Sequence, residues 1–501
     1  MTLLYRYMTQ RFRMLPAQVQ PSRMLPTLCA LSLVAFTGCK KYLDAPLPVN
    51  EIATASVYTT DNTSAAALNS IYSAIYTQGF FAGTGSVGYL TGSYGDELRN
   101  LSSTPSSIAL YEDGVSSTLG GVTGLWTEMY AQLYAINLAI ENLPGASVTD
   151  VLHKNQWLGE AYFLRGLMYF YLTNLYGAVP LVVSSNYATN NTLARSAQPA
   201  VYTQIIADLS QAQSLLSDDY YAATGATTAD RGRPNRMAAS AMLAKVYLYT
   251  GDWKDAEAQA DSVIGDANDY QLVSPLNTFL IGSPEVIWGV EPDDGYYPAY
   301  VEQDVVAYYM RAGTSPSLQA VGVCLSDSLV DAFEPGDLRY TDWVGADTVA
   351  ASGSTPAAVY YYAYKFKAIG SYTAPQEVIP MCRLAEQYLI RAEARAEQGN
   401  LGGAITDLNT IRARAGLPAS TAVSQADVLS AIARERRVEL FCEMGNRFFD
   451  LRRTGMLNAL MENVAVQKGG SWNSDGYQQW WPIPLSDVQN DTHLTQTPGF
   501  E

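Results

Sequence analysis

The chain has 501 residues, so it is long enough for one large hydrophobic core or for about two to three ordinary domains. Hydrophobic residues make up 48% and charged residues only 16%, a balance that excludes an intrinsically disordered chain. The net charge of −17 repels phosphate backbones, which argues against nucleic acid as a partner.

The first predicted element is a secretion leader. Residues 25–36 form an apolar run that follows several arginines and is too short to span a bilayer. The run ends at Thr37-Gly38-Cys39, which resembles the lipobox of bacterial lipoproteins, in which the cysteine is acylated and becomes the mature N-terminus. We therefore predict a lipoprotein signal peptide over residues 1–38 and a lipid anchor on Cys39. The alternative is an ordinary signal peptide with an incidental cysteine.

Beyond the leader, the hydrophobic pattern is mostly helical. Two stretches rich in Gly, Ser, Thr, Pro and Tyr, residues 79–125 and 266–380, interrupt it and are predicted to be loops, with a strand-like segment at 285–290. The predicted fold is mainly α, with long irregular loops and minor short β elements. Apolar residues recur at helical spacing in residues 64–78, 126–143, 155–176, 199–217, 236–250, 253–264, 383–398, 401–414 and 425–452.

Two of the predicted helix pairs are related to each other. Ala244 and Gly251 line up with Ala392 and Gly399 at a constant offset of 148 residues, and each pair reads helix, glycine turn, helix. This pattern resembles the tetratricopeptide unit, in which small residues let neighbouring helices approach closely. Residues 158–177 resemble a first helix of the same kind. Because the units are scattered between loops, we interpret them as a scaffold that holds those loops.

The sequence offers little material for catalysis or metal binding. Only two histidines and no C-x-x-C pair are present, so no metal and no cofactor is expected. Residues 83–88 match G-x-G-x-x-G, but they follow a predicted helix where a dinucleotide site requires a strand, so we interpret the match as a decoy. The paired acids Asp96-Glu97 and Asp293-Asp294 are the one pattern that a glycosidase shares, and adjacent acids more often cap turns or bind a cation. We predict that the chain is not an enzyme.

The carboxyl-terminal third carries the most specific motifs. Residues 435–440 read ERRVEL, and Glu443, Gly445, Arg447 and Asp450 follow at fixed spacing. With the block at 408–417, Trp-Pro-Ile-Pro at 481–484 and the ending at 496–500, these residues closely resemble the signature of the SusD/RagB family of nutrient-binding outer-membrane lipoproteins. Shorter matches, such as 160–165 and 175–180, extend the resemblance along the mature chain.

We expect the charged residues of this signature to lie on one helix. Arg436, Arg437, Glu439, Glu443 and Arg447 recur at three- and four-residue steps, a spacing that allows ion pairs. Exposed pairs stabilise a protein by only about 0–1 kcal/mol each, so the sequence predicts that these pairs are partly buried if they matter. We interpret them as residues that define the fold.

The resemblance implies a division into an N-terminal SusD-like region, 39–230, and a C-terminal SusD/RagB region, 231–501. It also implies a non-catalytic lipoprotein on the outer face of the outer membrane. Such a protein captures a nutrient, an oligosaccharide or a peptide, and delivers it to a SusC-like TonB-dependent barrel. The alternative function is a helical-repeat envelope scaffold that binds proteins only.

Sugar binding requires aromatic rings to stack on pyranose faces and polar groups to satisfy hydroxyls. Both ingredients are concentrated in the two loop-rich stretches, and we predict a shallow site between them. The competing interpretation is that these tyrosines seal loops onto helices. The predicted ligand-binding residues are Tyr94, Asp96, Glu97, Arg99, Asn100, Tyr111, Trp288, Tyr296, Tyr297 and Tyr300.

Overall fold

The computed structural model describes residues 57–77, 80–81, 83–147, 149–290, 322–350, 357–367 and 377–501. Residues 1–53 and 54–501 form separate units, and all described residues belong to the second. The predicted signal peptide and Cys39 therefore lie outside the described residues.

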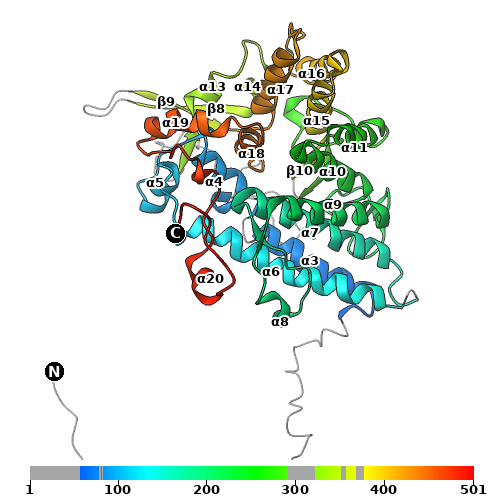
Figure 1. The fold of residues 1–501 in the computed structure, drawn as a ribbon. Coiled ribbons are helices and arrows are strands. Elements are labelled where there is room, and N and C mark those ends of the chain that lie inside the picture. The colour runs from blue at the N-terminus through cyan, green and yellow to red at the C-terminus, as the bar shows by residue number, and fades with distance from the viewer. Residues whose placement is uncertain are drawn as a thin grey trace, which may run out of the picture. The chain divides into compact units, whose positions relative to one another are not determined.

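Long helices that follow one another along the chain also pack against one another in nearly that order. Each helix contacts the next, from the first to the last of the set. Figure 1 shows the resulting stack, from the blue and cyan helices to the yellow and orange ones. These helices are α3 (Asp61–Thr77), α6 (Gly120–Asn142), α7 (Lys154–Tyr176), α9 (Gln198–Leu215), α10 (Arg236–Thr250), α11 (Trp253–Gly265), α15 (Leu384–Glu397), α16 (Leu401–Arg414) and α17 (Gln425–Glu439).

The predicted tetratricopeptide-like pairs are present as α10–α11 and α15–α16. Gly251 ends α10 with a φ of 75°, and Gly399 follows α15 with a φ of 81°, so each turn uses the left-handed conformation that glycine adopts without strain. Ala244 and Ala392, which lie at equivalent positions, are fully buried where helices cross. The repeat read from the sequence is therefore confirmed.

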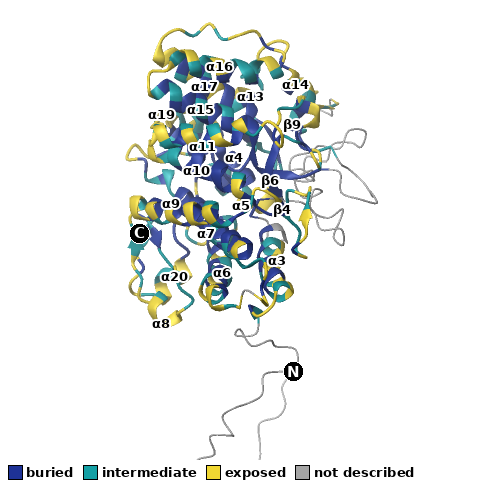
Figure 2. Ribbon diagram, turned by 90° about the vertical axis from the view of Figure 1, so that its right-hand side faces the viewer, coloured by how far each residue is buried: buried dark blue, intermediate teal, exposed yellow. Residues whose placement is uncertain are grey.

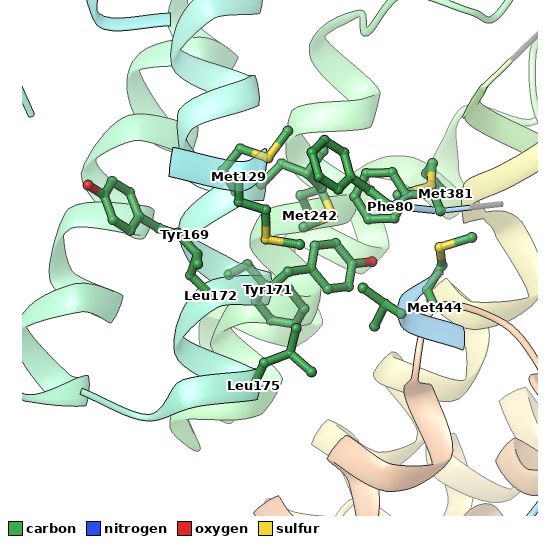
Figure 3. Close-up of a cluster of buried hydrophobic side chains, with 14 of the residues drawn as sticks. Phe80, Met129, Tyr169, Tyr171, Leu172, Leu175, Met242, Met381 and Met444 are labelled. Carbon is green, nitrogen blue, oxygen red and sulfur yellow. The ribbon is translucent and has the colours of Figure 1, made fainter. Parts of the chain in front are cut away.

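Helix α7 is the central helix of the scaffold. It is buried on every side from Phe163 to Tyr176, because helices on several sides cover it (Figure 2). Figure 3 shows Met129, Met242 and Phe80 gathered around Tyr171, while Tyr169 points away from this cluster. The helix organises the core, and its one charged residue in this buried part, Arg165, pairs with Asp208 over 2.6 Å.

The strands are short and form five separate two-stranded antiparallel sheets within the described residues. The predicted strand at 285–290 is confirmed as β6 (Val286–Val290), which pairs with β10 (Ile379–Arg383). The remaining pairs are β1 (Leu98–Asn100) with β7 (Val323–Leu325), β2 (Val179–Pro180) with β3 (Arg195–Ser196), β4 (Tyr220–Tyr221) with β5 (Thr227–Thr228), and β8 (Val344–Val349) with β9 (Ala358–Ala363).

Two predictions about local structure are wrong. The two loop-rich stretches contain short helices, and residues 457–468 also form a helix that the sequence did not predict. Residues 425–452 are two helices, because the backbone has positive φ at Cys442, Met444 and Gly445. The further helices are α4 (Val87–Tyr94), α5 (Pro105–Tyr111), α8 (Tyr187–Asn190), α13 (Asp327–Val330), α14 (Leu338–Trp343), α18 (Asn446–Arg453), α19 (Leu457–Lys468) and α20 (Leu485–Asn490).

Candidate functional site

Strands β1 and β7 bring the two loop-rich stretches together. β1 comes from the first stretch and β7 from the second, and Arg99 lies opposite Cys324 in the antiparallel register. The pairing continues beyond the strands, because the backbone N–H of Leu101 donates to the carbonyl of Gly322 over 2.9 Å. The predicted meeting of the two stretches thus has a structural basis at this short sheet.

A partly exposed aromatic and charged patch covers this pairing. The Arg99 guanidinium lies 5.4 Å from the centre of the Tyr360 ring on β9, and its Nη1 lies 4.0 Å from the carboxylate of Asp327. The Arg99 side chain is 39% exposed and that of Asp327 is 83% exposed, so both face solvent. We define the Arg99–Tyr360 patch as Arg99, Asn100, Tyr111, Asp327 and Tyr360.

The side chains of the patch differ in how firmly they are held. Burial alone lowers the pKa of Arg99, but Cys324 and Asp327 outweigh that effect and raise it. Asn100 accepts the backbone N–H of Ser102 over 3.0 Å and donates to the carbonyl of the same residue, which fixes its amide in a turn. Partial burial raises the pKa of the Tyr111 hydroxyl, so it stays a neutral hydrogen-bond donor.

Two of the predicted aromatic ligand contacts are enclosed by protein. The Tyr94 ring is fully buried, and its hydroxyl donates to the Gln478 carbonyl over 2.8 Å. The Trp288 ring is also fully buried, packs edge-on against Phe163 and donates its indole N–H to the Gly232 carbonyl over 3.1 Å. Neither ring has a free face for a sugar, so the expected ligand role of Tyr94 and Trp288 does not fit their place in the core.

Asp96 and Glu97 are buried directly before β1. Asp96 accepts from Arg437 over 2.9 Å and from Arg447 over 2.8 Å, and although burial favours protonation, these arginines lower its pKa. Glu97 accepts the backbone N–H of Cys442 over 3.3 Å and forms no salt bridge with any described residue, and burial together with the charge of Asp96 raises its pKa to about 7. Both carboxyl groups therefore hold β1 against the carboxyl-terminal helices, and their predicted contact with ligand does not fit this burial.

Tyr360 was not among the predicted ligand-binding residues, although it lies in the second predicted stretch. The signal was available, because residues 358–364 read AVYYYAY and place tyrosines on both faces of a strand. Tyr296, Tyr297, Tyr300 and the acids Asp293 and Asp294 lie outside the described residues.

The charged residues of the carboxyl-terminal signature form buried or partly buried ion pairs, and two of them, Glu439 and Glu443, belong to a larger network. The charged residues of the signature do not lie on one helix, because α17 ends at Glu439 and α18 begins at Asn446. Their predicted burial is confirmed. We define the buried ion-pair network as Glu285, Asp337, Arg339, Lys365, Arg383, Arg414, Glu435, Glu439 and Glu443, and no side chain among them is more than 9% exposed.

Arg383 and Glu439 are the centre of this network. Arg383 binds Glu443 over 2.8 Å and Glu285 over 3.1 Å, and it also contacts Glu439. Burial favours protonation of Glu439, but Arg414, Arg383 and Arg339 outweigh it and hold its pKa well below the usual range. The network joins β10 to the α17–α18 junction and has a structural role.

No group of three or more His, Cys, Asp or Glu side chains is arranged to hold a metal ion within the part of the chain that is described. Of the helices in that part, none combines the length and the apolar character that a membrane crossing requires.

The chain resembles known protein families in both halves. Residues 336–500 match the SusD family, and residues 50–248 match a family described as starch-binding and associating with the outer membrane. A SusD-like protein of Formosa agariphila is 24% identical over 93% of this chain and 98% of its own length. The starch-binding protein SusD of Bacteroides thetaiotaomicron is 26% identical over 73% of this chain and 76% of its own.

Solved structures share the fold. A SusD superfamily protein from Bacteroides vulgatus superposes with a TM-score of 0.73 at 21% identity, covering 89% of this chain and all of that one. A laminarin-binding SusD-like protein superposes with a TM-score of 0.71 at 25% identity, covering 88% of this chain and all of that one.

The tetratricopeptide-like scaffold with small two-stranded sheets is thus that of the SusD superfamily. The chain belongs to the SusD/RagB family, which confirms the resemblance seen in its sequence. Because the family is non-catalytic, the chain is not an enzyme. The predicted division near residue 230 stays a prediction.

Proposed function

We propose that the protein captures an oligosaccharide at the Arg99–Tyr360 patch. The observation that carries this proposal is the partly exposed Tyr360 ring beside the Arg99 guanidinium, at the pairing of two stretches far apart in sequence. The names of two relatives, one starch-binding and one laminarin-binding, support a glycan as the ligand.

The chemistry of the patch suits a sugar. A tyrosine ring stacks on the C–H face of a pyranose, while guanidinium donors and the Asp327 carboxylate satisfy hydroxyl groups. Side chains that are already held, such as Asn100, lose little entropy when a ligand binds. A shallow site of this kind gives modest affinity without chemistry.

We further propose that an acylated Cys39 anchors the protein to the outer face of the outer membrane, where it delivers its ligand to a SusC-like TonB-dependent barrel. The apolar leader before Cys39 supports the anchor, because acyl chains hold a protein on a membrane by burying methylene groups. Membership of the SusD/RagB family supports the barrel as partner.

Isothermal titration of the soluble form that starts at Lys40, against a panel of plant, host and microbial oligosaccharides, tests the capture function. We expect saturable binding without product formation, and we expect Tyr360→Ala to weaken it at least about tenfold. Tyr187→Ala is the matched control, because Tyr187 is 77% exposed and lies on α8, outside the patch.

A panel in which no glycan binds would reject the oligosaccharide, and the same titration with peptides would then follow. If neither binds while envelope proteins do, the protein is a scaffold. Equal losses of glycan affinity from Tyr360→Ala and Tyr187→Ala would show that the glycan does not bind at the patch.

A further inference from the structure

A pocket of about 940 Å³ lies on the helical scaffold and shares no residue with the Arg99–Tyr360 patch. It is enclosed by the α10–α11 turn, the end of α15, helix α17 and the α18–α19 segment. Its volume falls in the range of about 300–1,000 Å³ that is typical of small-molecule sites. Ser430, Ala433 and Ala459 in its lining are exposed, so the pocket is open to solvent and a ligand can enter it from outside.

Apolar side chains from α17 and the α18–α19 segment form one wall of the pocket. Leu440 and Leu451 are buried, Leu429 and Leu460 are partly buried, and Met456 is largely exposed. Contact with this wall removes apolar ligand surface from water, which stabilises a complex. The wall therefore favours a ligand with an apolar body.

Of the three acids that line the pocket, only Glu397 forms no ion pair with a described residue. Arg453 binds Glu393 over 2.8 Å and Asp450 over 2.8 Å, and Arg436 binds Asp450 over 2.7 Å. Glu397 is partly buried at the end of α15, where burial and the charge of Glu393 raise its pKa although Arg453 lowers it. A cation beside Glu397 would offset both effects, because an opposite charge favours the ionised carboxylate.

The arginines of the lining already bind carboxylates of the protein. Besides the two that bind Asp450, they are Arg437 and Arg447, which share Asp96. The charge in the pocket that lacks a partner is therefore negative, and charge complementarity favours a cationic ligand. Because the arginines lie on α17 and α18, a cationic group is favoured on the opposite side, at the end of α15.

Trp253 adds an aromatic ring to the same end of the pocket. The side chain of Gln398, the residue after Glu397, donates to the Trp253 carbonyl over 3.4 Å, so the end of α15 and the start of α11 lie side by side. The Trp253 ring is partly buried against both helices and also lines the pocket. Tryptophan attracts an ammonium group through the face of its ring, and a carboxylate accepts the N–H groups of that ammonium. This end of the pocket thus combines two groups that recognise organic ammonium ions.

We propose that this pocket binds a small organic ammonium ion with an apolar body. The ammonium group contacts the Glu397 carboxylate and the Trp253 ring, and the apolar body lies along the leucines of α17 and the α18–α19 segment. This site is separate from the proposed glycan site, so the two proposals stand or fall independently.

Isothermal titration of the soluble chain at neutral pH with octylammonium, octanol and sodium octanoate tests the proposal. These probes share one apolar chain and differ in the charge of the head group. We expect octylammonium to bind at least about tenfold more tightly than the other two, because only its head group donates charged hydrogen bonds to a carboxylate. Equal affinity for octylammonium and octanol, or tighter binding of octanoate, would overturn the proposal.

Glu397→Gln removes the proposed charge partner and keeps the shape of the side chain. We expect octylammonium affinity to fall about tenfold and octanol affinity to stay unchanged. The thermal unfolding midpoint should not fall, because Glu397 has no ion pair with a described residue to lose. Glu462→Gln, exposed on α19 and outside the lining, removes the same charge nearby and should leave octylammonium affinity unchanged. Equal losses from the two variants would show that the cation responds only to the net negative charge of the chain, which would reject the site.

Ala433→Trp tests the position of the apolar body. It fills the pocket from an exposed position on α17 and should weaken octylammonium binding at least about tenfold. Ala426→Trp, also exposed on α17 but outside the lining, is the matched control and should leave the affinity unchanged. Unchanged affinity in Ala433→Trp would contradict binding in this pocket. Because Ala433 lies outside the Arg99–Tyr360 patch, the glycan affinity of Ala433→Trp should equal that of the unsubstituted chain whichever result is obtained.

Discussion

The buried ion-pair network and the Arg99–Tyr360 patch both combine arginine, acid and aromatic residues, yet they differ in how those residues are held. In the network, Arg383 has three carboxylate partners and is 1% exposed. In the patch, Arg99 has one distant carboxylate partner and is 39% exposed on its side chain. Residues whose charged groups are fully paired within the protein define the fold. Residues whose charged groups are only weakly paired and face solvent are available to a ligand.

This difference has an energetic side. Charges that are buried in pairs contribute little net stability, but removing one partner leaves an uncompensated charge in a low-dielectric interior. Charges at the surface are screened by water and cost little to remove. Substitutions should therefore separate the two regions by their effect on folding and on binding.

The largest effect is expected for Arg383→Leu. It leaves Glu285, Glu439 and Glu443 without their shared partner, and we expect the free energy of unfolding to fall by about 3–5 kcal/mol. Urea denaturation of the soluble chain measures this change.

Arg236→Ala is the control for that measurement. Arg236 pairs with Asp218 at the surface, where both side chains are about half exposed, so its removal should cost no more than about 1 kcal/mol. Similar losses for the two variants would remove the distinction between buried and exposed pairs.

Gly445→Ala tests the turn between α17 and α18, which also contains Glu443 of the network. Gly445 has a φ of 72°, and a Cβ there would lie 2.9 Å from both Phe449 and Thr91. Gly455 has the same φ, but nothing lies within 4 Å of its Cβ position. We expect Gly445→Ala to cost about 2–4 kcal/mol and Gly455→Ala about 1–2 kcal/mol in urea denaturation, since only the first adds a clash. Equal costs would show that backbone strain alone matters.

Glu97→Gln probes the boundary between the two regions. The pKa of Glu97 is raised to about 7, so the folded state favours the protonated carboxyl. Its contribution to stability is present below pH 4.5 and is lost as the pH rises through about 7. The variant imitates the protonated form, and its advantage over the unsubstituted chain should therefore grow from pH 5 to pH 8, by at most about 3 kcal/mol.

Urea denaturation at both pH values checks this prediction, with Glu462→Gln, exposed on α19, as the control. Asp96 does not interfere, because its pKa is lowered and it stays ionised throughout this range. A Glu97→Gln variant that is less stable at pH 8 would show that the carboxylate is a needed partner.

The sequence predicted the scaffold better than the site. Gly251 and Gly399 could be predicted as turn residues, because glycine adopts positive φ without strain. The apolar residues that recur at helical spacing likewise indicate which helix faces are buried. The break after Glu439 could not be predicted, because Cys442 and Met444 adopt positive φ in spite of their side chains. Tertiary contacts around Glu443 override the helical pattern there.

The site was harder because burial is not a local property. Tyr94 and Tyr360 each lie in one of the two predicted loop-rich stretches, but Phe448, Trp472 and Trp481 enclose Tyr94. Those partners lie more than 350 residues further along the chain. Composition therefore identifies the two stretches that pair, whereas only the tertiary structure determines which aromatic rings remain exposed to solvent.

Of all these substitutions, we expect Arg99→Ala in the patch to have the smallest effect on folding, in contrast to Arg383→Leu in the network. Arg99 lies over Tyr360 and its side chain is 39% exposed, so its removal should change the free energy of unfolding by less than about 1 kcal/mol. Glycan affinity, measured by titration, should nevertheless fall about three- to tenfold, because a guanidinium donor to the sugar is lost. Arg99→Lys should recover part of that affinity, since it restores the charge but not the planar stack. A loss of stability above about 2 kcal/mol with unchanged affinity would place Arg99 among the structural charges and leave Tyr360 and Tyr111 as the remaining candidates for the sugar-binding surface.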